Sequence, residues 1–234
     1  MQPLAMTSSQ TPYRHIRERV AAAALRAGHA VRLLAVSKTK PARAIAELAE
    51  LGQHEFGENY VQEALAKQRE LGGRALQWHL IGPLQSNKCR EVAAHFDWLQ
   101  TLDREKLIGL LDRHRPATLA PLNVLIQVNV DDEASKSGCA PTAIVPLAEK
   151  IARAPRLRLR GLMAIGQPHP DFEIRRAAFR RMRGLFDDLR AMHADIDTLS
   201  LGMSDDFELA IEEGATLVRI GTAVFGARDA THPA

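Results

Sequence analysis

The sequence predicts an α/β fold, a single TIM-type (β/α)8 barrel with an extra N-terminal helix. Eight short apolar runs alternate with helical stretches over 234 residues. Each connection between them contains a helix, so neighbouring strands are expected to be parallel. Eight such repeats over roughly this length are typical of a closed barrel. A doubly wound open sheet is the alternative, but its G-x-G-x-x-G fingerprint is absent.

The chain has no linker and no break in composition, which favours one domain over residues 12–228. Residues 1–11 are polar and carry no signal-peptide core, so we expect a flexible N-terminal tail there. Residues 229–234 follow the last predicted strand and its loop, and are expected to form a C-terminal tail.

Charge and composition exclude several classes of protein. The net charge is only +3, with acidic residues spread among the basic ones, so nucleic acid is not an expected partner. No apolar run is long enough to cross a membrane. Two cysteines and scattered histidines show no metal-ligand spacing, which favours reduced thiols and no metal. We therefore expect a cytoplasmic protein, and a monomer.

Helical spacing of apolar residues begins at Tyr13 and ends at Gly28. Pro41 suits the first turn of the next helix, and glycines or Pro116 stop several of the later ones. The helices are predicted at 13–27, 41–52, 60–72, 85–95, 104–114, 144–154, 172–192 and 206–213.

The predicted strands are short, nearly continuous apolar runs, as expected for strands buried on both faces of a parallel sheet. The run from Asn123 to Val130 is the clearest of them. The strands are predicted at 32–37, 54–56, 76–81, 97–101, 123–130, 158–165, 198–201 and 217–220.

Lys38 follows the first of these strands, at the end where α/β folds place reactive groups. A lysine held partly out of water has its ammonium form disfavoured, and its neutral amine can form a Schiff base with a carbonyl. Taken alone, the stretch favours a lysine that simply points into solvent, and the rest of the chain has to decide between the two.

The loops after the seventh and eighth strands combine glycines with hydroxyl groups, an arrangement that suits a phosphate. Ser204 could instead cap a helix, and Asp205 and Asp206 beside it would oppose an anion. Gly221 and Thr222 are therefore the stronger candidates for binding phosphate.

Arg219, inside the eighth strand, needs either a carboxylate or a ligand acceptor if it is buried. A ligand with its phosphate near Gly221 could bring a carbonyl to Lys38, because the first and eighth strands are neighbours in a closed barrel. Phosphate, aldehyde and an arginine at a ring nitrogen together describe pyridoxal phosphate. Lys136 is a second lysine at this mouth, or else a solvated loop residue.

Six stretches carry a resemblance to a known family: LAVSKTKP at 34–41, FGENYVQE at 56–63, HLIGPLQSNK at 79–88, GLMAI at 161–165, LGMSDD at 201–206 and VRIGTAVFG at 218–226. With these stretches the chain resembles the pyridoxal-phosphate homeostasis proteins, single-domain relatives of the N-terminal barrel of alanine racemase.

The resemblance implies that Lys38 carries the cofactor as a Schiff base and that Arg219 faces the pyridine nitrogen. It implies phosphate contacts from Ser200, Gly221 and Thr222, and an accessory role for Lys136 in taking or passing the aldehyde. The full expected cofactor-binding set is Lys38, Asn59, Met163, Ser200, Met203, Ser204, Arg219, Gly221 and Thr222, with Lys136 and His79 as accessory residues.

The resemblance also implies binding and buffering of pyridoxal phosphate, with PLP-dependent apo-enzymes as possible recipients, and no established catalytic activity. An arginine disfavours protonation of the ring nitrogen, which makes the ring a poorer electron sink. We expect no second domain to supply a tyrosine base; Tyr13 and Tyr60 are the only tyrosines. The alternatives are a racemase-like PLP enzyme and a cofactor-free Schiff-base aldolase.

Overall fold

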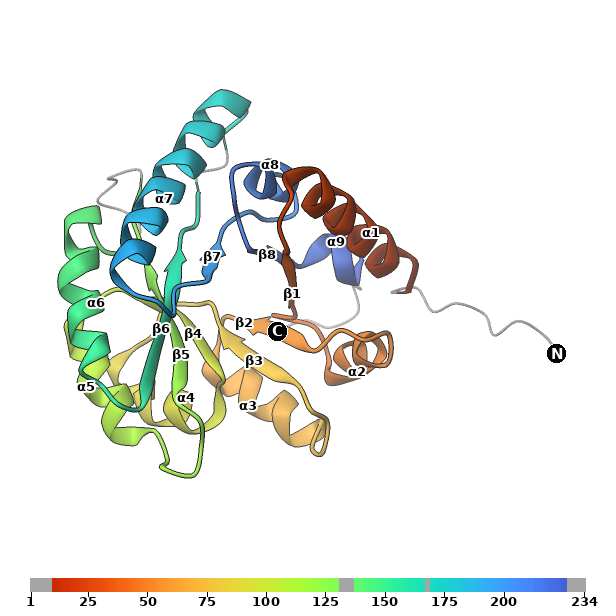
Figure 1. The fold of residues 1–234 in the computed structure, drawn as a ribbon. Coiled ribbons are helices and arrows are strands. Elements are labelled where there is room, and N and C mark those ends of the chain that lie inside the picture. The colour runs from red at the N-terminus through yellow and green to blue at the C-terminus, as the bar shows by residue number, and fades with distance from the viewer. Residues whose placement is uncertain (1–9, 131–136, 167–168, 227–234) are drawn as a thin grey trace.

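Eight parallel strands close into a barrel in which each strand pairs with the next along the chain and β8 pairs with β1 (Figure 1). This computed structural model describes residues 10–130, 137–166 and 169–226. The predicted fold class is confirmed. The closing register pairs Arg32 with Leu217 and Ala35 with Ile220, which places the end of β1 beside the end of β8.

The strands lie close to their predicted positions. Five of the eight are shorter than predicted by one or two residues, because the chain leaves the sheet as soon as its loop begins. They are β1 (Arg32–Val36), β2 (Glu55–Glu58), β3 (Gln77–Leu80), β4 (Trp98–Leu102), β5 (Leu122–Gln127), β6 (Leu157–Met163), β7 (Thr198–Ser200) and β8 (Leu217–Ile220).

Helices surround the barrel on its outside (Figure 1). They are α1 (Gln10–Ala27), α2 (Ala42–Glu50), α3 (Val61–Glu70), α4 (Cys89–His95), α5 (Glu105–His114), α6 (Ile144–Ala152), α7 (Phe172–Met192), α8 (Phe207–Glu212) and α9 (Thr222–Phe225), with 3-10 turns η1 (Ser86–Lys88) and η2 (Pro141–Ala143).

Most helix ends lie within one or two residues of their predicted positions, and three larger differences remain. Helix α1 begins at Gln10, so residues 10 and 11 belong to a helix and not to the tail. The helix predicted over 85–95 divides into η1 and α4. Helix α9 was not predicted, since a single turn is too short for apolar periodicity to reveal.

The main core lies between the barrel wall and the helices. Helix α7 illustrates how: Ala178, Met182 and Leu189 lie on its buried face, at helical spacing. Its first turn is capped by the Asp171 carboxylate, which accepts the Glu173 N–H at 2.8 Å. The inside of the barrel forms a separate, smaller apolar cluster of Trp98, Leu125 and Met163.

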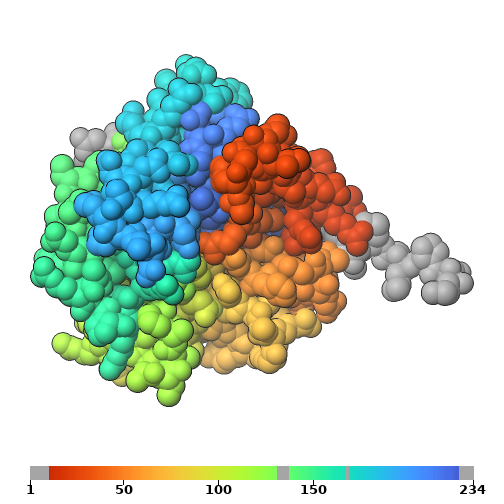
Figure 2. Space-filling view, viewed as in Figure 1, coloured from red at the N-terminus to blue at the C-terminus, as the bar shows by residue number. Residues whose placement is uncertain are grey.

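Helix α1 packs on the outside of the barrel against α8 and α9. Figures 1 and 2 show this N-terminal helix beside the C-terminal part of the chain. Tyr13 of α1 is 1% exposed, and its hydroxyl donates to Gln53 Oε1 at 3.3 Å. The extra helix is therefore integral to the wall that supports the strand ends of β8 and β1.

Candidate functional site

A cavity of about 350 Å³ opens at the C-terminal ends of the strands, within the size range of small-molecule sites. It brings together seven of the residues predicted from the sequence: Lys38, Asn59, Met203, Ser204, Arg219, Gly221 and Thr222. They come from the ends of β1, β2, β7 and β8, which the barrel gathers at one mouth.

One predicted residue, Lys136, lies outside the described residues. Three predicted residues that the structure does describe do not line this cavity. Met163 is fully buried in the apolar cluster inside the barrel. Ser200 and His79 are also fully buried, below the cavity rather than on its surface. The strand-end rule places these three correctly along the chain, but it does not say which side of the strand each faces.

Lys38 is exposed on the cavity wall, in the loop that joins β1 to α2. The withdrawal from water that we expected for this lysine is therefore not observed. The next residue, Thr39, has φ of 62°, in the left-handed region that residues with a branched Cβ rarely adopt. Strained backbone of this kind often accompanies functional loops.

Arg219 forms the floor of the cavity and is only 5% exposed. Its Nη1 donates to Ser200 O at 2.8 Å and to Ser200 Oγ at 2.7 Å, and its Nη2 donates to Ala164 O at 2.8 Å. Burial lowers the pKa of Arg219 to about 10, so the group remains protonated at neutral pH. Neutral acceptors hold a guanidinium whose positive charge faces the cavity.

The Ser200 hydroxyl is fully engaged below the cavity. It accepts from Arg219 and donates to Gln100 Oε1 at 2.7 Å, so Ser200 supports Arg219 from below, and its contact with a phosphate stays a prediction. Gln100 Nε2 in turn lies 3.0 Å from His79 Nδ1. An amide nitrogen can only donate, so His79 accepts at Nδ1 and carries its proton on Nε2.

His79 Nε2 faces the Glu55 carboxylate at 3.4 Å, and the ring stacks on Trp98 at a centroid distance of 5.1 Å. Burial lowers the pKa of His79, which favours the neutral ring. The hydrogen bonds therefore run in one direction through the barrel interior, from Arg219 through Ser200 and Gln100 to His79. His79 Nε2 continues the series toward Glu55 at ion-pair distance. We call these five residues the interior chain. It explains why His79 is absent from the mouth.

The turn after β8 has N–H groups without a partner inside its own helix. Val224 and Phe225 both donate to Gly221 O, so the N–H groups of Thr222 and Ala223 have no partner within α9. Gly221 and Thr222 line the cavity. Together with the Thr222 hydroxyl, these groups could hold an anion.

The loop after β7 is less suited to an anion. The Asp206 carboxylate accepts the Met203 N–H at 2.7 Å and brings negative charge to this loop. The N-cap position of α8 is Asp206, so the alternative of Ser204 as a helix cap does not hold. Ser204 remains on the cavity wall beside Met203.

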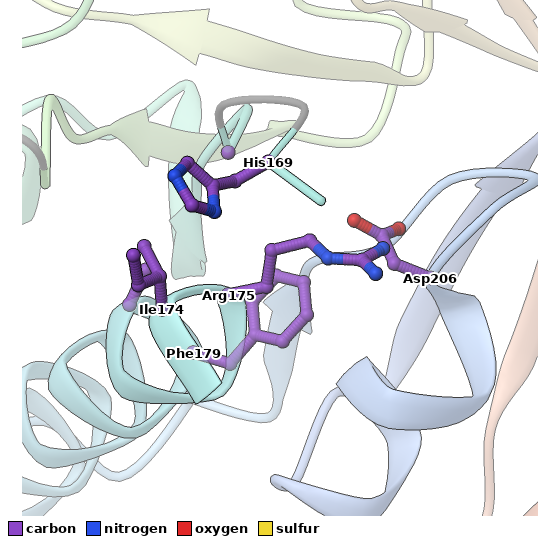
Figure 3. Close-up of a pocket in the computed structure, with 7 residues that line it drawn as sticks. His169, Ile174, Arg175, Phe179 and Asp206 are labelled. Atoms are coloured by element: carbon purple, nitrogen blue, oxygen red, sulfur yellow. The ribbon is translucent and has the colours of Figure 1, made fainter. Parts of the chain in front are cut away.

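A second cavity, of about 40 Å³, lies between the start of α7 and the loop before α8 (Figure 3). Arg175 and Asp206 extend toward one another across it, with His169 and Phe179 on its walls. Its volume is close to that of one water molecule, so it is too small for a cofactor.

Several lining residues are not among those predicted from the sequence, including Thr39, Lys40, Ile81, Ile165 and Gly226. Thr39 and Lys40 directly follow Lys38 and could have been found from that position. Gly226 lies after a helix that was not predicted, and its carbonyl accepts from Lys40 Nζ at 3.3 Å.

Among the described residues, no group of three or more His, Cys, Asp or Glu side chains could hold a metal ion. A search of the same residues finds no helix with the length and apolarity needed to span a membrane.

Residues 13–229 match the family described as alanine racemase, N-terminal domain. The chain belongs to this family. It is 55% identical over 220 residues to the pyridoxal phosphate homeostasis protein of Escherichia coli K12, covering 92% of this chain and 94% of that protein. It is 57% identical over 219 residues to the protein of the same name from Pseudomonas aeruginosa, covering 94% of each chain.

Among solved structures, the chain is similar to PipY of Synechococcus elongatus PCC7942 with PLP bound. That chain is 37% identical, with a TM-score of 0.78 over 90% of this chain and 100% of PipY. The family resemblance found in the six sequence stretches is confirmed.

Proposed function

We propose that this protein binds pyridoxal 5'-phosphate, holds it through a Schiff base at Lys38, and acts in intracellular homeostasis of the cofactor as a buffer or carrier. The observation that carries the proposal is the joint placement of Lys38, Arg219 and the Gly221–Thr222 turn around one cavity. The names of relatives more than half identical to this chain support the same reading.

The residues present fit the chemistry of this cofactor, which supplies an aldehyde, a basic ring nitrogen and a phosphate. Lys38 provides a primary amine for the aldehyde. Arg219 provides a donor for the ring nitrogen, and its orientation is fixed by Ser200 and Ala164. Thr222 and the N–H groups of its turn provide donors for the phosphate.

The same residues favour binding over catalysis. Arg219 remains protonated at neutral pH and can only donate, so it disfavours a proton on the ring nitrogen and weakens the ring as an electron sink. Among the described residues, no histidine or tyrosine lines the cavity. Tyr13 is buried under α1, and Tyr60 is 62% exposed. Apart from Lys38 itself, Lys40 is thus the one amine in the described lining, and no histidine, tyrosine or carboxylate there offers a second acid or base.

We further propose that PLP-dependent apo-enzymes receive the cofactor, that the protein is a monomer, and that it works in the cytoplasm. The exposure of Lys38 supports exchange with solvent, since a carrier must release what it holds. The buried, unpaired thiols of Cys89 and Cys139 suit a reducing compartment.

Borohydride trapping tests the binding proposal. Wild type incubated with pyridoxal phosphate and reduced should gain the mass of one pyridoxyl phosphate group, and peptide mapping should place it on Lys38. Lys38→Ala should lose both this adduct and the absorbance band of the Schiff base, whereas Lys150→Ala, on the outer helix α6, should keep them. A wild-type protein that forms no reducible adduct would overturn the proposal.

A racemase-like enzyme is the second candidate, favoured by the alanine racemase family match. Loaded protein incubated with L- or D-alanine in deuterated water distinguishes the two functions. We expect α-proton exchange no faster than with free cofactor, and exchange at an enzymatic rate would replace the carrier proposal. A cofactor-free aldolase would instead show no reducible cofactor adduct and no chromophore.

A further inference from the structure

Three charged residues form a buried cluster directly behind the Lys38 loop. Lys67 of α3 is 5% exposed and Glu58 of β2 is fully buried, while the Glu63 side chain is 27% exposed. Lys67 Nζ lies 2.7 Å from Glu58 Oε1 and 2.6 Å from Glu63 Oε1. We call Glu58, Glu63 and Lys67 the charged triad.

The charged triad holds the peptide groups on both sides of Lys38. Lys67 Nζ donates its third hydrogen bond to Ser37 O at 2.7 Å, which is the carbonyl immediately before Lys38. Glu63 Oε1 accepts the N–H of Thr39 at 2.6 Å, which is the amide immediately after Lys38. One ion pair on α3 therefore fixes both peptide planes that flank the lysine.

The geometry of this loop needs such support. Thr39 occupies the left-handed region with φ of 62°, a conformation that costs free energy for a β-branched residue unless its surroundings impose it. The Thr39 N–H bond to Glu63 is one interaction that imposes it. The Ser37 side chain adds another anchor, since its hydroxyl donates to Glu58 Oε1.

Glu58 links the same triad to a second cavity residue. Asn59 follows Glu58 directly and lines the cavity. The β3 end packs tightly against it, because a Cβ at Gly82 would lie 2.1 Å from Asn59 O. The charged triad thus joins the ends of β1 and β2, which are neighbours at the mouth of the barrel.

Overall stability is a weak explanation for this arrangement. Removing carboxylates and an ammonium from water costs free energy that offsets much of the gain from their attraction. Buried ion pairs therefore commonly add little net stability. All three ammonium hydrogens of Lys67 have acceptors, and one acceptor is the loop carbonyl beside Lys38. This pattern fits a positional role.

We propose that Lys67 and Glu63 are positioning residues that fix the Ser37–Thr39 backbone and thereby direct the Lys38 amine into the cavity. The inference rests on the proposed function for the reaction that Lys38 performs. In that reaction the neutral amine forms a C=N bond with the aldehyde carbon, loses both its hydrogens, and the carbonyl oxygen leaves as water. Its rate depends on how often the amine occupies a productive position.

Lys67→Met tests the proposal, since it keeps the length of the side chain and removes its charge. We expect the absorbance band of the Schiff base to appear about 10- to 100-fold more slowly than in wild type. The fraction trapped by borohydride after a short incubation should fall in parallel. Pyridoxine 5'-phosphate, which has an alcohol in place of the aldehyde, should bind with a dissociation constant within about threefold of wild type.

Glu63→Met is a second variant in case Lys67→Met does not fold. Position 63 is partly exposed, so an uncharged side chain there leaves no buried charge at that position. The substitution removes the acceptor of the Thr39 N–H and should slow Schiff-base formation by about 3- to 10-fold. Lys150→Met is the matched control, since it removes the exposed ion pair with Glu105 on the outer helices. Lys67→Arg should restore part of the lost rate.

The outcomes separate the two proposals. A wild-type protein without a trapped adduct defeats the proposed function itself. A wild type that forms the adduct, with folded Lys67→Met and Glu63→Met variants that form it at the wild-type rate, overturns the positioning role alone. Equal losses of Schiff-base formation and of pyridoxine phosphate binding would also overturn it, because they indicate a general collapse of the cavity.

Discussion

Arg219 shows how one residue can serve both the fold and the site. Its guanidinium bonds to two backbone carbonyls, Ser200 O and Ala164 O, and so joins the ends of β6, β7 and β8. Burial lowers its pKa to about 10, yet leaves it charged under physiological conditions. The residue that would face the ring nitrogen is therefore also a structural element of the cavity floor.

Replacement of Arg219 should consequently cost stability even without cofactor. In Arg219→Met, Ala164 O and Ser200 O each lose a guanidinium donor, although Ser200 O keeps the Ala164 N–H. We expect the free energy of unfolding to fall by about 1–3 kcal/mol. Urea denaturation at pH 7 measures the change. Arg190→Met, on the exposed face of α7, should shift it by less than about 0.5 kcal/mol. An unchanged stability in Arg219→Met would contradict the bonding seen here.

At the scale of elements, α1 supports from outside the part of the cavity wall that follows β7 and β8. It packs against α8 and α9, the two helices that follow the last strands. Arg19 of α1 donates two hydrogen bonds to the Glu208 carboxylate of α8, from Nε at 3.2 Å and from Nη2 at 2.9 Å. Helix α1 thus shields from solvent a part of the barrel wall that the short helices α8 and α9 alone would leave exposed.

The two tyrosines provide a matched test of this packing. Tyr13→Ala creates a cavity under α1 and should lower the free energy of unfolding by about 3 kcal/mol. Tyr60 is 62% exposed, and Tyr60→Ala should change it by less than about 0.5 kcal/mol. Thermal or urea unfolding of both variants gives the comparison. Equal effects would mean that α1 does not depend on Tyr13 for its attachment.

At the scale of the molecule, the interior chain connects the cavity floor to the opposite end of the barrel. It crosses from β8 through β7, β4 and β3 to β2, with every donor directed away from Arg219. Successive hydrogen bonds in such a series polarise one another, and the series tolerates few alternative arrangements. They fix the tautomer of His79 and the rotamer of Gln100.

Because His79 of the interior chain is buried, we expect the stability of the protein to depend on pH. Burial lowers the pKa of His79 in the folded protein below its ordinary value, so the unfolded chain binds a proton first as pH falls. The contribution of His79 is present above about pH 6.5 and is lost as pH falls from there toward the depressed folded pKa. Stability should therefore decline below about pH 6.5, by at most about 1.4 kcal/mol per pH unit from this group.

His79→Gln removes the titrating imidazole and puts a neutral amide in its place. Its free energy of unfolding should decline less steeply than that of wild type between about pH 6.5 and 5.5. His54→Gln is the control, since His54 is exposed just before β2. The interpretation fails if the wild-type and His79→Gln slopes are parallel.

Much of the fold could be predicted because apolar runs and helical spacing depend on local sequence. Strand-end reasoning also identified Lys38, Asn59, Arg219, Gly221 and Thr222 as residues of one mouth, since a closed barrel leaves few other arrangements. What local sequence could not supply is the direction of each side chain. Ser200 and His79 lie at correctly predicted strands and point into the interior chain instead of the cavity.

The sequence by itself determined the barrel, the order of its strands and the lysine at the end of the first, because these follow from periodicity and from motifs within short stretches. Only the tertiary structure decided what surrounds that lysine. Lys67 and Glu63 lie about thirty residues away in sequence, on an outer helix, yet they bond the peptides on either side of Lys38. Such contacts depend on how a helix packs against the end of a strand. No pattern within a short stretch of sequence predicts which residues of the two elements meet.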